Sequence, residues 1–178
     1  IDFETFRAIR DHFSGMIYLD LHSLALGRKE DGTRYHRPFP DAHKWIELCD
    51  ILQLNENEFN IINTSEKTPE DYFSRHCRQE NKIVNVTLSD KGSISIFEEN
   101  EDIVAYPAKP PSSIEVIDPT GCGDAFAAGF INHYLKTSDI REAAVHANTI
   151  AAVYGHYRGL PDPDLVRDTY LTHAMKEL

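Results

Sequence analysis

The chain has 178 residues, of which 41% are hydrophobic and 26% are charged, and these values fit one globular domain. Its net charge of −11, with no block of basic residues, argues against nucleic acid as a partner, because contacts to phosphates need clustered cations. No run approaches the ~20 apolar residues of a membrane-spanning helix, which argues against a membrane as a partner.

The first part of the chain combines helical and strand patterns. Residues 2–13 place apolar side chains at helical spacing, and the apolar run at 16–21 predicts a short buried strand. The long polar stretch at 22–40 predicts a surface loop. Asp41 is expected to cap the helix that follows, and the apolar run at 50–54 predicts a second buried strand.

The remaining patterns continue this alternation. A short helix is expected from Asn55, and Thr68-Pro69-Glu70-Asp71 predicts the start of a helix that runs to about Asn81. Residues 82–89 read as a strand with β-branched alternation, and 93–97 should pair back as a hairpin. The later elements are expected as strands at 102–108 and 114–118, and as helices at about 121–135, 139–155 and 163–177.

Strands that alternate with helices predict a parallel sheet covered on both faces, within a single α/β domain over residues 1–178. Ligands of such sheets bind beyond the carboxyl ends of the strands. Asn55, Ser89 and Asp118 each follow a predicted strand, and we expect them to face one crevice.

The segment DPTGCGDAFAAGF, residues 118–130, is the most informative pattern in the chain. Gly121 and Gly123 lack a Cβ, so the backbone there can approach a ligand closely. The apolar helix that follows presents free N–H groups and a positive dipole to an anion. Asp124 is then either a helix cap or a general base that takes a proton from a hydroxyl attacking a phosphoryl group.

Two further segments could bind a ligand together with this turn. Asn55 and Glu58 share a face at a helix start, where they could reach Mg²⁺ or phosphate oxygens, or could simply form a capping box. The turn from Thr87 to Gly92 could meet a ribose or a phosphate, or could be an ordinary hairpin turn.

Together, the three segments resemble motifs of the ribokinase-like (PfkB-type) carbohydrate kinases, over roughly residues 15–160. Residues 118–124 match the family's D-T-x-G-A-G-D signature, Asn55 to Glu58 match N-x-x-E, and residues 87–92 match T-x-G-x-x-G. The resemblance implies a three-layer α/β/α fold with a mostly parallel central sheet. It also implies ATP-dependent phosphorylation of a hydroxyl on a sugar or nucleoside, in the cytoplasm, where ATP and reduced thiols coexist.

The resemblance implies a role for each matching residue. Asp124 is the base that deprotonates the substrate hydroxyl, and the amides of Gly121, Cys122 and Gly123 form an anion hole for the migrating phosphoryl group. The resemblance also implies that Asn55 and Glu58 help to position Mg²⁺ and the phosphates of ATP. Thr87, Gly92 and Asn148 are implied to contact the nucleotide. Asp118 and Thr120 are implied to bind a monovalent cation such as K⁺.

The chain also departs from the family pattern. Pro119 replaces the usual Thr, Cys122 replaces the common Ala, and Ser89 replaces a Gly. The chain begins at Ile1, after the region where family members carry their Gly-rich sugar-binding motifs and the β-strand lid. We therefore expect it to be the C-terminal part of a longer kinase, and a homodimer through the lid would need residues outside it.

Three other interpretations remain open. Nine histidines without HxxxH or HExxH spacing favour packing or surface roles over a metal site. Three cysteines without metal-type spacing favour free thiols, although Cys122 at a helix N-terminus could have a lowered pKa and act as a nucleophile. A truncated, non-catalytic domain that binds nucleotide or a partner is the alternative to a kinase.

Overall fold

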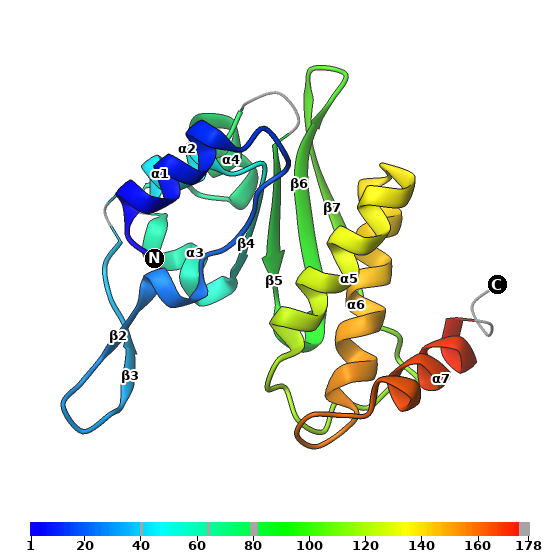
Figure 1. Cartoon of the computed structure of the whole chain (residues 1–178). Helices are drawn as coiled ribbons and strands as arrows, with labels where there is room; N and C mark the ends of the chain where they lie inside the picture. The colour runs from blue at the N-terminus through cyan, green and yellow to red at the C-terminus, as the bar shows by residue number, and fades with distance from the viewer. Residues whose placement is uncertain (40, 64, 79–81, 175–178) are drawn as a thin grey trace. The chain divides into compact units, whose positions relative to one another are not determined.

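The computed structural model describes residues 1–39, 41–63, 65–78 and 82–174. They form two compact units (Figure 1). The sheet unit comprises Ile1–Leu88 and Ile94–Tyr106, and the helical unit comprises Ser89–Ser93 and Pro107–Leu178.

Most of a five-stranded sheet belongs to the sheet unit. Its strand order is β1 (Tyr18–Asp20), β4 (Ile51–Asn55), β5 (Ile83–Thr87), β6 (Ser93–Glu99) and β7 (Asp102–Ala108). β1 pairs parallel with β4, and β4 pairs parallel with β5. Residues of β4 and β5 are buried on both faces, as expected for parallel strands between layers of side chains.

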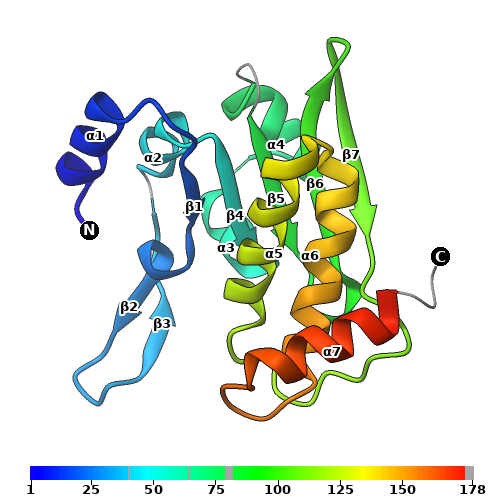
Figure 2. The same cartoon turned by 45° about the vertical axis from the view of Figure 1, so that its right-hand side comes forward.

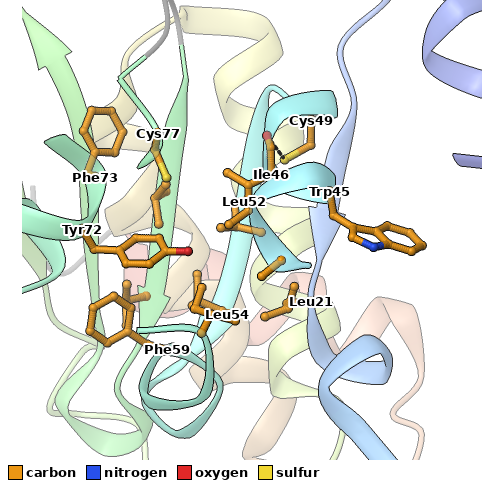
Figure 3. Packing of buried hydrophobic residues seen from close by; sticks show 14 of the residues in the cluster. Leu21, Trp45, Ile46, Cys49, Leu52, Leu54, Phe59, Tyr72, Phe73 and Cys77 are labelled. Atoms are coloured by element: carbon orange, nitrogen blue, oxygen red, sulfur yellow. Dashed lines mark hydrogen bonds between the residues drawn. The ribbon is translucent and has the colours of Figure 1, made fainter. Parts of the chain in front are cut away.

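Four helices of the sheet unit cover one core. They are α1 (Phe3–His12), α2 (Ala42–Leu48), α3 (Glu56–Ile62) and α4 (Pro69–His76). Leu52 and Leu54 of β4 pack in this core with Trp45, Phe59 and Phe73 (Figure 3). Fully burying one such side chain contributes roughly 1.5–3 kcal/mol, so this cluster stabilises the parallel strands that end at the candidate site.

The segment 22–40, expected to be a loop, contains regular structure instead. A 3-10 helix, η1 (His22–Ala25), leads into β2 (Leu26–Arg28), which pairs antiparallel with β3 (Arg34–His36). The turn between the strands places Gly32 at φ +86°, and the Gly32 amide donates to the Lys29 carbonyl. Asp31-Gly32 is a turn signal between two strands, and the expectation of a loop overlooked it.

Three other expectations need correction. Asp41 makes no capping bond, because its carboxylate pairs with Lys44 at 2.8 Å. α4 ends at His76, and its expected extension to Asn81 reaches residues outside the described ones. Residues 114–118 form no strand, so Asp118 does not follow one: the amides of Ile117 and Asp118 both donate to the Gly155 carbonyl at a helix end.

The helical unit contains α5 (Cys122–Thr137), α6 (Ile140–Gly155) and α7 (Pro163–Ala174), close to the expected bounds. α5 and α6 lie side by side (Figures 1 and 2). Their backbones approach closely at Gly129, where an added Cβ would lie 3.1 Å from the Ala147 Cα. Among the described residues, no helix is long and apolar enough to cross a membrane.

A cluster of rings joins the three helices of this unit. His133 of α5 and His146 of α6 have ring centroids 4.9 Å apart, and His146 Nδ1 lies 2.8 Å from the Tyr170 hydroxyl of α7. Burial lowers the pKa of His146, and the charges of His133 and Lys136 lower it further. The cluster therefore favours a neutral His146.

Candidate active site

The Gly-rich turn before α5 is held by the carboxylate of Asp118. Asp118 Oδ1 accepts from the Thr120 amide at 3.0 Å, and Oδ2 accepts from the Gly159 amide at 3.2 Å. These bonds, with that from Thr120 first, hold the pKa of Asp118 below its usual range. Asp118 therefore fixes the turn to the loop after α6.

Two glycines allow this turn to lie directly on α6. Gly121 has φ +84°, and a Cβ there would lie 2.9 Å from Tyr154 Cε1. A Cβ on Gly155 would lie 2.7 Å from Cys122 Sγ. A larger residue at either position would force Tyr154 or Cys122 to shift, so glycine suits both sides of the contact.

Gly121 occupies the N-cap position of α5, with no side-chain capping bond. Asp124 is the third residue of the helix and is exposed. No described residue donates a hydrogen bond to its carboxylate or pairs with it. The interpretation of Asp124 as a helix cap is therefore wrong, and its carboxylate is available to a ligand.

One expected anion-hole amide has a partner within the turn, because the Cys122 amide donates to the Pro119 carbonyl at 3.1 Å. The Cys122 thiol also donates, to the Ala151 carbonyl at 3.4 Å. Burial raises the pKa of this thiol, and the charge of Asp118 raises it further. The hypothesis of a lowered pKa at Cys122 is therefore wrong, since the neutral thiol is favoured.

In the sheet unit, Asn55 and Glu58 form the capping box that was the alternative interpretation. The Asn55 side chain accepts from the Glu58 amide at 3.0 Å, and Glu58 Oε2 accepts from the Asn55 amide at 2.8 Å. Glu58 is only 1% exposed, and its Oε1 lies 3.2 Å from His22 Nδ1. Asn55 is also the register partner of Thr87, so these residues meet at the carboxyl ends of β4 and β5.

His22 was missed from the sequence, although the available signal was the one that identified Asn55. Each residue lies close behind the carboxyl end of a predicted strand. The His22 side chain is 56% exposed and lies against the buried Glu58 carboxylate. It therefore extends the polar group of Asn55 and Glu58 toward solvent.

The predicted nucleotide turn lies in the helical unit from Ser89 onward. Ser89 has φ +58° and begins a 3-10 turn, η2 (Ser89–Lys91). Gly92 has φ +94°, and a Cβ there would lie 2.0 Å from the Ala108 carbonyl oxygen. The buried side chain of Asn148 donates to Ser93 Oγ and to the Ala144 carbonyl, both at 2.8 Å. Asn148 thus supports the residue that follows the turn.

The structure thus brings the predicted residues together in groups. The sheet unit groups Asn55, Glu58 and Thr87, to which His22 is added. The helical unit contains the turn 118–124, and it also links Gly92 with Asn148 through Ser93. Within the described ranges, no group of three or more His, Cys, Asp or Glu side chains could hold a metal ion.

Comparison with known proteins supplies the family. The model of the pfkB family carbohydrate kinases matches residues 29–163. This chain belongs to the PfkB family of carbohydrate kinases. An "uncharacterized sugar kinase" of Archaeoglobus fulgidus is 49% identical over 132 residues, which are 70% of this chain and 49% of the relative. An ATP-dependent 6-phosphofructokinase of Thermoanaerobacterium thermosaccharolyticum is 27% identical over 84% of this chain and 44% of its own length.

Solved structures confirm the ribokinase-like α/β fold. A ribokinase of Thermotoga maritima matches 97% of this chain and 54% of its own, with a TM-score of 0.68 and 20% identity. The nucleoside kinase of Methanocaldococcus jannaschii matches the same shares with a TM-score of 0.64 and 22% identity. This PfkB chain spans about half the length of the relatives it matches.

Proposed function

We propose that this chain is the C-terminal part of an ATP-dependent kinase that phosphorylates a hydroxyl of a sugar or nucleoside. The observation that carries the proposal is Asp124, which is exposed, has no partner among the described residues and lies in the first turn of α5, three residues after the left-handed Gly121. A carboxylate there stands beside the positive end of a helix, where an anionic phosphoryl group is favoured. Asp124 is the general base that accepts the proton of the attacking hydroxyl.

The backbone of the turn supplies the electrostatic part of the reaction. Amides of Gly121, Cys122 and Gly123 would stabilise the charge that develops on the transferring phosphoryl group. The Cys122 amide now donates to Pro119, so its contribution requires that this bond be shared or exchanged. The bonds of Asp118 to Thr120 and Gly159 keep the turn in place while the amides act.

Residues of the other groups fit a nucleotide and its cations. Carboxylate and amide oxygens are ligands that Mg²⁺ accepts, and Mg²⁺ usually retains several waters. Glu58 Oε2 already accepts from the Asn55 amide, which fits an indirect role through a water. Bound Mg²⁺ would neutralise the charge of the ATP phosphates.

Thr87, Gly92 and Asn148 would line or support the nucleotide site. Asp118 and Thr120 would hold a monovalent cation such as K⁺. The carboxylate of Asp118 has lone pairs that its two hydrogen bonds do not use, and these could contact the cation.

An assay of ADP release with a panel of sugars and nucleosides tests the proposal on the full-length gene product and on this chain. Asp124→Asn should abolish acceptor-dependent ADP release while nucleotide binding persists. Asp164→Asn is the matched control, since Asp164 is also an acid in the first turn of a helix. Undiminished turnover in Asp124→Asn would exclude Asp124 as the base. Nucleotide binding without turnover by the intact protein would favour the non-catalytic alternative, which the half-length match to relatives keeps open.

A further inference from the structure

Two arginines oppose each other on the β2–β3 hairpin. Arg28 and Arg34 are register partners on the two antiparallel strands. Side chains in this relation have Cβ atoms about 5 Å apart, and like charges there destabilise a strand pair. The stability of the hairpin therefore does not explain why both positions carry a cation.

No carboxylate among the described residues neutralises the charge of this pair. Among the described residues, no carboxylate forms an ion pair with Arg28, Lys29, Arg34 or Arg37. The nearby Asp31 carboxylate instead accepts from the Thr33 amide. Four cations within ten residues, none paired with a carboxylate among the described residues, stand out in a chain whose net charge is −11.

The hairpin starts beside the residues proposed to bind the nucleotide. η1 joins the carboxyl end of β1 to β2, and its His22 contacts Glu58, which follows the carboxyl end of β4. The Arg37 amide donates to Ala25 and its Nε donates to Leu24, which ties the base of the hairpin to η1. The hairpin extends beyond this end of β4 in both views (Figures 1 and 2), and beyond this end of β1 in Figure 2. Ligands of such sheets bind on that side.

We propose that Arg28 and Arg34 bind a phosphate group of a small-molecule ligand between their guanidinium groups. The inference rests on the proposed kinase function and adds a ligand class to it. A planar guanidinium matches phosphate oxygens through paired hydrogen bonds, and an anion between two arginines removes their mutual repulsion. The phosphate belongs either to the nucleotide or to an acceptor that is already phosphorylated.

Calorimetric titration at low salt separates these two sources. The probes are ATP, fructose 6-phosphate and fructose, added to the full chain and to the variant Arg28→Gln/Arg34→Gln. A loss of at least about tenfold in affinity for fructose 6-phosphate, with ATP unchanged, supports a phosphorylated acceptor. The same loss for ATP alone supports the nucleotide. Binding of both phosphate-bearing probes within twofold of the wild type overturns the proposal.

Two controls keep the result interpretable. Arg7→Gln/Arg167→Gln removes two other exposed arginines and should leave all affinities unchanged; an equal loss there would show a general charge effect and overturn the proposal. Arg34→Lys keeps the charge but loses the planar group, so intermediate weakening is expected. The kinase proposal is tested by turnover in Asp124→Asn, whereas the arginine pair is tested by affinity in Arg28→Gln/Arg34→Gln, so failure of one proposal and failure of the other give different results.

Discussion

The side-chain amide of Asn148 donates to the Ser93 hydroxyl at 2.8 Å and joins the middle of α6 to the start of β6. Ser93 is 1% exposed, so its hydroxyl depends on partners inside the protein. The Asn148 amide also closes a bond to the Ala144 carbonyl of its own helix. This side chain therefore holds the backbone directly after the proposed nucleotide turn.

Asn148→Ala should lower the free energy of unfolding by about 1–3 kcal/mol, because it leaves a buried hydroxyl without this partner. Urea unfolding measures the loss, and nucleotide affinity should fall with it. Asn132→Ala on the exposed face of α5 is the control and should change stability by less than about 0.5 kcal/mol. An unchanged urea midpoint in Asn148→Ala would contradict the supporting role.

Gly92 and Gly159 form a matched pair, since both have positive φ angles but different surroundings. A Cβ on Gly92 would lie 2.0 Å from the Ala108 carbonyl oxygen, whereas a Cβ on Gly159 would meet nothing within 4 Å. Gly159→Ala should therefore cost only the left-handed strain, roughly 1 kcal/mol. Gly92→Ala should cost more than about 3 kcal/mol by adding a steric clash. Equal losses in thermal unfolding would show that space at Gly92 does not matter.

Gly155→Ala should disturb the Gly-rich turn before α5 through Cys122, whose Sγ would lie 2.7 Å from the new methyl group. We expect a loss of roughly 1–3 kcal/mol, as for overpacking of a close contact. Cys122→Ala in the same chain should restore part of that loss, because it removes the sulfur. The four-variant cycle in urea measures this coupling. Strict additivity would mean that the contact with Cys122 is not what limits position 155.

His146 predicts a pH dependence of stability. Its pKa is lowered in the folded chain from the ordinary value of 6.5, so the unfolded chain binds the proton more readily. The stabilising effect is complete above pH 6.5 and decreases as the pH falls from there toward the folded pKa. His146→Gln should flatten the decrease in melting temperature between pH 7.5 and 5.5. His12→Gln, which changes an exposed histidine, is the control, and the same slope in both variants would remove His146 as the cause.

The thiols provide a further test of the turn. Burial raises the pKa of all three cysteines, to about 11 for Cys49 and about 12 for Cys77, and the Asp118 charge adds to the effect at Cys122. Iodoacetamide should therefore modify the native chain at pH 7.5 more slowly than it modifies free cysteine. Mass spectrometry identifies the site. Rapid alkylation of Cys122 would revive the thiol-nucleophile hypothesis.

Local chemistry explains which features the sequence could predict. The start of α4 at Pro69 is fixed by Thr68, whose side chain accepts from the Asp71 amide, and such caps can be read from neighbouring residues. Residues 114–118 have a strand-like pattern, but the amides of Ile117 and Asp118 donate to the carbonyl of Gly155, which is distant in the sequence. No local pattern contains that partner. The contact of Cys122 with Gly155 was hidden for the same reason.

Among the candidate residues, too, some properties follow from local sequence patterns and others only from the tertiary fold. The capping box of Asn55 and Glu58 follows from a three-residue spacing, so both of its interpretations could be stated in advance. That the Asp124 carboxylate has no partner among the described residues depends on the tertiary fold around it, which no local pattern contains. The role of His22 depends on β1 lying next to β4, which only strand pairing establishes.

α6 contacts both turns of the proposed kinase site that lie in the helical unit. Asn148 holds the residue after the nucleotide turn, and the Gly155 carbonyl receives the amides that lead into the turn of Asp124. These two points are seven residues apart, which is roughly 10 Å along a helix axis. A helix of this length transmits displacement with little compression, so any shift of α6 along its axis would carry both turns by the same amount. The spacing between the proposed nucleotide turn and the proposed base, Asp124, would then be preserved during such a motion.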